Sequence, residues 1–237
     1  MPAPRCRWTS WSRRRAERQR SDRLDRPAVH PPFAVGSRVV NLRTFVPPRA
    51  VETAAPPEPG ESARRLPPPG AEGTRPAVVA FLRHTGCPFA EATMRQLRDA
   101  AGAHPEIEWI AVSHAGAQPT QRWCDAVGGR GDVHVLLDPE RVFYAAWGLG
   151  RSSLGHFLGR RSLGEVKRLA REGIRNRHPD GTRWQQAGAF AVDASDVVRW
   201  RHLPEHAGEL PDLEAAAAAA APSGSGTSAP AAGASRA

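Results

Sequence analysis

Cysteine is scarce in this chain, which contains only Cys6, Cys87 and Cys124. Three cysteines are an odd number and too few for a disulfide scaffold, so the sequence favours a reducing compartment. Long apolar runs are missing as well, because no stretch approaches the roughly 20 residues that span a bilayer. The arginines near the N-terminus are not followed by an apolar core, which argues against a secretory signal. We therefore expect a cytoplasmic protein with no membrane partner.

Several motifs that define enzyme classes are also absent from the sequence. No metal-ligand spacing, phosphate-binding loop or Ser/His/Asp arrangement stands out, so we expect no metal and no other cofactor. The net charge of +9 is unevenly distributed, since residues 1–74 contain 14 arginines and only 7 acidic residues. Residues 75–221 are nearly neutral. The basic character therefore belongs to the N-terminal region, and we expect no specific nucleic-acid partner.

The composition divides the chain into a folded domain and two flanking regions. Residues 1–74 are predicted to be a disordered Arg/Pro-rich region, with one or two short strands over residues 33–46 and a proline-rich linker over residues 47–75 that buries no core. Residues 75–221 are predicted to be the folded domain. Residues 222–237 are rich in serine, glycine, alanine and proline and are predicted to be a disordered tail.

The folded domain shows a regular alternation of strand and helix patterns. Apolar runs predict strands over residues 77–83, 107–112 and 133–137, and helical spacing predicts helices over residues 88–101, 118–127 and 139–147. This order predicts a parallel sheet with right-handed crossovers that place helices on its faces. Further along the chain, a capping-box pattern at Ser162–Glu165 predicts the start of an amphipathic helix that ends near Gly173. A hairpin over residues 187–202 and a helix over residues 210–221 are predicted to follow.

Three chemically interesting side chains follow the three parallel strands. Cys87, His114 and Asp138 each lie at or just past a strand end, where open α/β sheets bind their ligands. Pro88 suits the first position of a helix, which places Cys87 at the helix start. Free N–H groups and the positive end of the helix dipole favour a thiolate there.

Each candidate residue also has a structural interpretation. Cys87 is either a reactive thiol or a cysteine that fills the junction between strand and helix. His84 either assists it electrostatically or by proton transfer, or lies exposed in a loop. His114 is either a base or substrate contact or a structural residue. Cys124 either resolves an oxidised Cys87 or is a buried, inert thiol in mid-helix. The basic residues 151–183 either attract an anionic substrate or partner, or form a solvated helix face.

Three separated segments resemble one known family. Residues 81–88 (FLRHTGCP), residues 136–149 (LLDPERVFYAAWGL), and residues 184–193 (WQQAGAFAVD) with residues 198–202 (VRWRH) are similar to the AhpC/TSA antioxidant family, a peroxiredoxin-like branch of the thioredoxin-fold superfamily. The resemblance implies an α/β, thioredoxin-like fold of peroxiredoxin type, with a central mixed sheet flanked by helices. It covers roughly residues 75–221.

The resemblance also implies a function. We expect a thiol-dependent antioxidant oxidoreductase that reduces a peroxide or other small oxidant through Cys87 and is regenerated by a thioredoxin- or glutathione-like thiol. The protein is a candidate homodimer. Beside Cys87, the candidate catalytic residues are His84 and Thr85, the candidate resolving residue is Cys124, and the candidate substrate-binding residues are Arg83, His114, Asp138 and Arg183.

The sequence departs from the family pattern at several positions. Ala90 stands where a thioredoxin-type pair has its second cysteine, which argues against dithiol exchange. Peroxiredoxins have proline and threonine at the positions of Ala80 and His84, and Thr85 lies one place off. Their peroxide-binding arginine corresponds to Ala187 when counted from the hairpin turn. The alternative prediction is therefore a catalytically degenerate thioredoxin-fold module that binds or regulates a partner.

Overall fold

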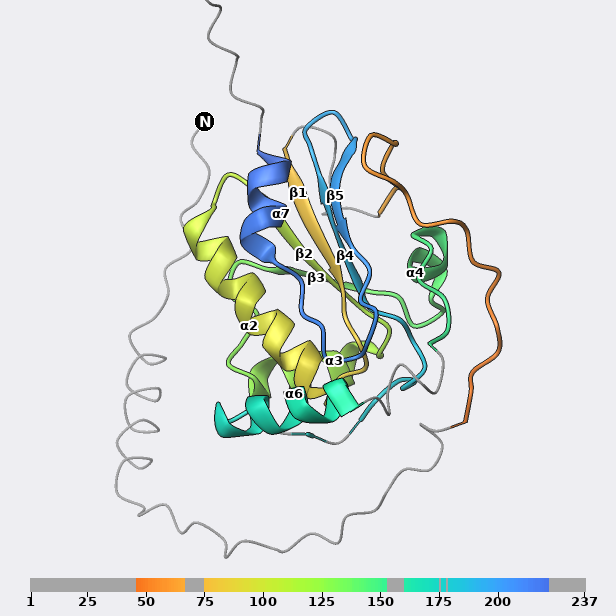
Figure 1. Cartoon of the computed structure of the whole chain (residues 1–237), viewed down its shortest axis with the longest axis vertical. Helices are drawn as coiled ribbons and strands as arrows, with labels where there is room; N and C mark the ends of the chain where they lie inside the picture. The colour runs from red at the N-terminus through yellow and green to blue at the C-terminus, as the bar shows by residue number, and fades with distance from the viewer. Residues whose placement is uncertain (1–45, 67–74, 153–159, 175, 178, 222–237) are drawn as a thin grey trace, which may run out of the picture. The chain divides into compact units, whose positions relative to one another are not determined.

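The computed structural model describes residues 46–66, 75–152, 160–174, 176–177 and 179–221 (Figure 1). The two disordered regions predicted at the chain ends lie largely outside these residues. Cys6 and the short strands predicted over residues 33–46, apart from Val46, are also outside the described part.

The described residues form a mixed, five-stranded sheet with the strand order β3-β2-β1-β4-β5. Strands β1, β2 and β3 are mutually parallel, whereas β4 and β5 form the antiparallel hairpin that the sequence predicts. The central strands are buried on both faces, as expected for parallel strands covered by helices. The strands are β1 (Ala77–Phe81), β2 (Glu108–Ser113), β3 (His134–Leu137), β4 (Gly188–Val192) and β5 (Val198–His202).

Helices cover both faces of this sheet (Figure 1). Their bounds are α2 (Pro88–Ala103), α3 (Ala117–Ala126), α4 (Val142–Ala146), α6 (Arg160–Arg171) and α7 (Leu213–Ala220). Alternate residues of β1 face two separate cores: Val78 and Ala80 pack with α2 and α7, whereas Val79 and Phe81 pack with α4. Within the described ranges, no helix is long and apolar enough to cross a membrane. This arrangement is the thioredoxin-like α/β fold predicted from the sequence.

Two helix starts differ from the predictions. Helix α4 begins at Val142 rather than at Pro139, because Arg141 has a left-handed backbone with φ of 61°. Asp138 still provides the predicted capping carboxylate, although it does so from outside the helix. Helix α6 begins at Arg160, so the predicted capping box at Ser162 does not start it.

Residues 47–66, the described part of the linker predicted over residues 47–75, contact the folded domain. The Val198 N–H donates to the Glu61 carbonyl at 2.9 Å, and Ser62 and Val197 form an isolated antiparallel bridge beside the start of β5. Pro56 packs against Gly148, where a Cβ atom would lie only 2.3 Å from the proline nitrogen. The prediction overlooked the open edge of β5, whose backbone groups provide partners for an extended segment.

Candidate active site

The loop that follows β1 carries the central residue of the site. Cys87 is the N-cap of α2, with an extended backbone (φ −73°, ψ 130°), and Pro88 occupies the first helical position as predicted. The loop can turn into the helix because Gly86 adopts a positive φ of 86°. The backbone N–H of Cys87 then donates to the carbonyl of His84 at 3.1 Å.

Cys87 is a free thiol with only 5% of its surface exposed. Its side chain makes no capping hydrogen bond to the helix, so the sulfur is not committed to a structural role at the N-terminus. The N–H groups of the first turn and the helix dipole stabilise a negative charge at this position.

Two guanidinium groups add positive charge around Cys87. Arg83 is buried, and its Nη2 donates to the carbonyl oxygen of Arg183 at 3.3 Å. Burial lowers the pKa of Arg183, attraction to the Cys87 thiolate raises it, and repulsion by Arg83 lowers it. The electrostatic attraction places Arg183 near Cys87, and the hydrogen bond to its carbonyl places Arg83 beside Arg183.

His84 lies in the same loop but contributes no charge at neutral pH. The pKa of His84 is lowered to about 3, mainly by burial. A hydrogen bond to the Thr85 carbonyl raises this pKa, whereas repulsion by Arg83, Arg183 and His114 lowers it. Its Nδ1 lies 2.9 Å from the Thr85 carbonyl, which can only accept, so Nδ1 carries the proton. Its Nε2 is therefore a neutral hydrogen-bond acceptor.

His114 is held on both sides at the end of β2. Burial lowers its pKa to about 4, and the Nε2 of its neutral ring donates to the Thr182 carbonyl at 3.1 Å. The ring packs edge-on against Tyr144, with 5.5 Å between ring centroids. A Cβ atom on Gly181 would lie 2.8 Å from the imidazole, so this position requires glycine. These contacts favour the structural interpretation of His114.

Asp138 and Tyr144 support the strand ends. The Asp138 carboxylate accepts the backbone N–H groups of Val142, Phe143 and Tyr144 at 2.8–3.0 Å. The hydroxyl of Tyr144 lies 2.6 Å from the carbonyl oxygen of Leu82, to which it donates. Asp138 therefore acts as a helix cap rather than an exposed substrate ligand. Sequence reasoning did not identify Tyr144, although it is the only tyrosine in the chain.

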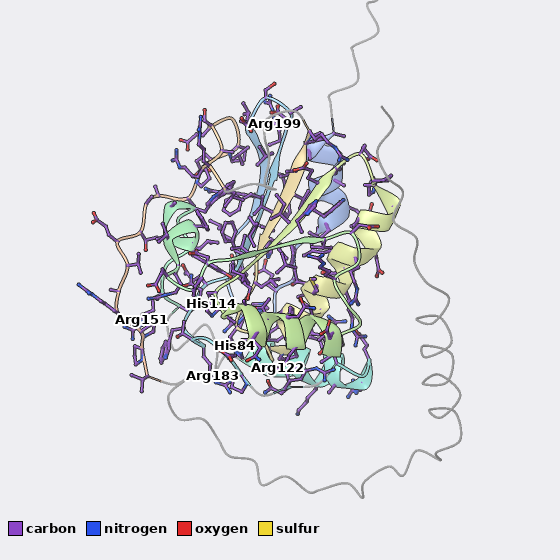
Figure 2. The ribbon with its side chains drawn as sticks, turned by 180° about the vertical axis from the view of Figure 1, so that it is seen from behind. His84, His114, Arg122, Arg151, Arg183 and Arg199 are labelled. Atoms are coloured by element: carbon purple, nitrogen blue, oxygen red, sulfur yellow. The ribbon has the colours of Figure 1, made fainter. Side chains whose placement is uncertain are left out.

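A segment that comes much later in the chain contacts the Cys87 loop. We call Arg177 and residues 179–183 the strap. Its Arg177 N–H donates to the Gly86 carbonyl at 2.9 Å, and its Asp180 N–H donates to the Thr85 carbonyl at 3.2 Å. Figure 2 shows His84, His114 and Arg183 gathered at one end of the molecule, far from Arg199.

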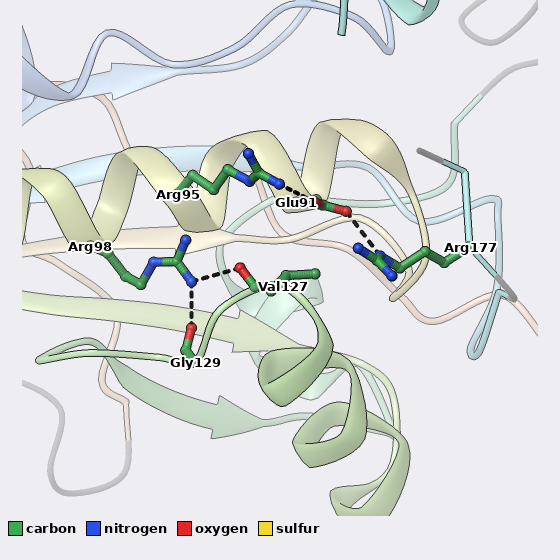
Figure 3. Close-up of polar contacts among 6 residues, drawn as sticks. All are labelled: Glu91, Arg95, Arg98, Val127, Gly129 and Arg177. Carbon is green, nitrogen blue, oxygen red and sulfur yellow. Dashed lines mark hydrogen bonds and ion pairs between the residues drawn. The ribbon is translucent and has the colours of Figure 1, made fainter. Parts of the chain in front are cut away.

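Glu91 links the strap to helix α2 (Figure 3). Its carboxylate is 1% exposed and lies 2.6 Å from Nη2 of Arg95, within the helix, and 3.1 Å from Nε of Arg177, in the strap. Sequence reasoning missed this pair, because its members are 86 positions apart. The only available signal was an acidic residue on the apolar side of a predicted helix.

Cys124 has different surroundings. It lies in α3, 3% exposed, and burial raises the pKa of its thiol, as does the Asp125 carboxylate. Arg130 and Arg98 oppose that rise. These charged neighbours differ from those of Cys87, so the structure favours a buried, unreactive thiol over a resolving one.

The basic insert is described only in part. The side chains of Arg160 and Arg161 lie outside the described residues, whereas Lys167 is exposed on α6. The guanidinium of Arg151 lies 5.0 Å from the ring centre of Trp184.

The mixed five-stranded sheet flanked by helices defines a thioredoxin-like fold, with Cys87 at the start of α2. Residues 93–206 match the family model described as AhpC/TSA antioxidant enzyme. The match confirms that the chain is similar to the peroxiredoxin-like AhpC/TSA family. The matched part begins after Cys87, so the role of this cysteine depends on the geometry around it.

Solved structures with a similar fold include three oxidoreductases. A thiol peroxidase from Chromobacterium violaceum is 14% identical, with a TM-score of 0.48, over 70% of this chain and 87% of that chain. A peroxiredoxin 6 variant from Arenicola marina is 12% identical, with a TM-score of 0.49, over 68% and 70%. A secreted Mycobacterium tuberculosis disulfide oxidoreductase is 18% identical, with a TM-score of 0.39, over 64% and 85%. The comparison with curated proteins found no match.

Proposed function

We propose that the protein is a thiol-dependent peroxidase whose nucleophile is Cys87. The observation that supports this proposal most directly is the position of a free thiol at the N-terminus of α2, where it interacts electrostatically with Arg183. Helix dipole and guanidinium charges favour the thiolate, which is the reactive form of cysteine. The same charges stabilise the negative oxygen that leaves during peroxide reduction.

The proposed reaction proceeds through a sulfenic acid. The Cys87 thiolate attacks the terminal oxygen of a hydroperoxide, the O–O bond breaks, and an alkoxide or hydroxide leaves and takes up a proton. One external thiol then condenses with the sulfenic acid to form a mixed disulfide and water. A second thiol attacks that disulfide, which releases Cys87 and the oxidised reductant. Two electrons thus pass from two thiols to the peroxide.

The role proposed for neutral His84 is electrostatic, because a pKa of about 3 makes its Nε2 too weak a base to take the proton of the Cys87 thiol at pH 7. Its Nε2 is unprotonated at neutral pH, whereas the arginines can only donate. Thr85 is a weaker candidate for a catalytic role, because its hydroxyl is directed to the Asp180 carbonyl at 3.4 Å. Arg83 and Arg183 are the proposed contacts for the peroxide oxygens.

The reductant is proposed to be an external thiol in the cytoplasm. Position 90, where a second cysteine would lie closest in sequence, is an alanine. Burial raises the pKa of the Cys124 thiol, which disfavours Cys124 as a resolving thiol. A thioredoxin- or glutathione-like molecule would therefore supply the electrons.

The test combines turnover with trapping of the intermediate. Purified protein is mixed with hydrogen peroxide and a dithiol, peroxide consumption is followed, and a parallel sample receives a sulfenic-acid trap for mass spectrometry. Consumption that depends on both thiol and protein, with the trap on Cys87, is the expected result. A peroxide rate equal to that without protein, and no trapped Cys87, would contradict the proposal.

The second candidate function is a binding module without chemistry. Two observations favour it: Cys87 is nearly buried, and Ala90 replaces a redox cysteine. In that case Cys87→Ser would leave a cellular phenotype intact, while charge reversal in residues 151–177 would abolish it.

A further inference from the structure

We infer that the Glu91–Arg177 ion pair holds the strap against the Cys87 loop and thereby selects small oxidants over bulky ones. The inference names a substrate class and therefore builds on the proposed peroxidase function. Glu91 and Arg177 would act as positioning residues, since they control access to the sulfur rather than touch the reacting atoms.

The strap is attached to the loop that carries Cys87. Its backbone bonds to Gly86 and Thr85 are only 2.9 and 3.2 Å long, and they join it directly to the loop that carries Cys87. Arg183, at the other end of the strap, receives the Nη2 hydrogen bond of Arg83. The strap therefore lies against the Cys87 loop along most of its length.

Glu91 is the side chain that fixes the strap to α2. The Glu91 carboxylate is buried, and an unpaired buried charge is very unfavourable, so its partners are strongly held. Arg95 reaches this carboxylate from one turn along the same helix, whereas Arg177 reaches it from the strap (Figure 3). Only the second partner connects α2 with the strap.

Cys87 is almost completely buried, which limits the size of a molecule that can reach it. Cys87 is 5% exposed while the strap is in place. Hydrogen peroxide is close to water in size and needs only a small opening to reach the sulfur. A hydroperoxide with a bulky organic group, or a reducing thiol, needs the strap to move. The pair would therefore set the size limit of the oxidant.

Two arginines on one carboxylate provide a matched pair of variants. The Arg177 side chain is 39% exposed, so Arg177→Met should fold normally while it releases the strap. Arg95→Met is the control, because it removes the other partner of Glu91 without affecting a strap contact. Arg177→Lys keeps the charge and should restore part of the restriction.

The measurement is the rate of Cys87 alkylation by a small and by a bulky reagent, with no peroxide present. Iodoacetamide and a fluorescein-linked maleimide are compared in each variant, and mass spectrometry identifies the labelled cysteine. We expect Arg177→Met to raise the bulky-to-small rate ratio about tenfold, as for a tenfold larger open population. Arg95→Met should stay within about twofold of the parent, in line with an unchanged strap.

A second readout compares hydrogen peroxide with cumene hydroperoxide as substrates of the same variants. Arg177→Met should raise kcat/KM for cumene hydroperoxide more than for hydrogen peroxide, and Arg177→Lys should reverse most of that change. Equal bulky-to-small ratios in parent and Arg177→Met, or an equal shift in Arg95→Met, would overturn the inference. Absence of peroxide turnover in the parent would instead overturn the proposed function and leave the alkylation result to decide the role of the strap.

Discussion

Among the described residues, two buried cysteines have sharply different surroundings. Cys87 and Cys124 are 5% and 3% exposed, respectively, and both are free thiols. Cys87 begins a helix and interacts electrostatically with Arg183, whose carbonyl accepts a hydrogen bond from Arg83. Cys124 lies within a helix, where burial and Asp125 raise the pKa of its thiol. Because both residues are similarly buried, we expect backbone position and nearby charge to decide which thiol reacts.

The comparison extends to the supports of each cysteine. The Cys87 loop is held by the strap on one side and by Tyr144, through the Leu82 carbonyl, at the end of β1. Cys124 is supported by ordinary helix packing in the core shared with Trp123. A site built from long-range contacts should be more sensitive to substitution and to acid than a helix interior.

Replacing each cysteine in turn tests the comparison most severely. Cys87→Ser should lower thiol-dependent peroxide consumption more than about 1,000-fold, because it removes the nucleophile. Cys124→Ser should leave the rate within about twofold, as for a residue outside the reaction. The measurement is kcat/KM for hydrogen peroxide at saturating reductant. A large loss in Cys124→Ser would show that the two cysteines act together.

Mild acid should destabilise the region around Cys87 more than the region around Cys124. Burial lowers the pKa of His84 to about 3 and of His114 to about 4, so the unfolded chain binds more protons than the folded chain below pH 6.5. Stability is therefore fully present above pH 6.5 and is lost as the pH falls toward 4. The loss is on the order of 3 kcal/mol for each histidine.

Amide hydrogen exchange at pH 7 and pH 5 resolves where this loss occurs. The loop around His84 and the residues after β2 should lose protection at pH 5 before helix α3, which carries Cys124. His114→Gln should reduce the acid sensitivity of the first region. Equal loss of protection in both regions would argue against a local effect of the histidines.

Removing one arginine from each region should affect only the nearby thiol. Arg183→Met should slow Cys87 alkylation at pH 7 about three- to tenfold, as expected when ~1 kcal/mol of thiolate stabilisation is lost. Arg130→Met should leave Cys87 unchanged and slow Cys124 slightly, because Arg130 opposes the rise in the Cys124 pKa. Site-resolved mass spectrometry of iodoacetamide labelling measures both rates. Equal effects on both thiols would indicate general loosening instead of local charge.

Tyr144→Phe should have the smallest effect. The substitution removes the hydroxyl that donates to the Leu82 carbonyl, at the base of the Cys87 loop. The expected destabilisation is about 1–2 kcal/mol, the cost of a buried acceptor that loses its donor. Urea unfolding measures it, and labelling should show Cys87, but not Cys124, becoming more accessible. A stability equal to that of the parent would mean that water replaces the hydroxyl.

The sequence was sufficient to predict the central part of the fold. Apolar runs identified β1, β2 and β3, and their parallel order placed Cys87, His114 and Asp138 at one sheet edge. Pro88 correctly indicated the start of α2. These features depend on local patterns, which are readable along the chain.

The contacts that complete the site depend on segments far apart in sequence. Arg183 is a candidate substrate-binding residue in the sequence, but only the path of the strap shows its neighbours: its carbonyl oxygen accepts a hydrogen bond from Arg83, and its guanidinium interacts electrostatically with Cys87. The pairing of Glu91 with Arg177 likewise depends on tertiary structure. Proline content suggested a linker over residues 47–75, because composition does not reveal that the edge strand β5 offers backbone partners to residues such as Glu61.

The central claim is that backbone position and charge make Cys87 the reactive thiol. The most direct test is the ratio of iodoacetamide alkylation rates of Cys87 and Cys124 in the same folded sample at pH 7. We expect Cys87 to react at least about ten times faster, because its surroundings favour the thiolate. A ratio near one, or faster reaction of Cys124, would contradict the account.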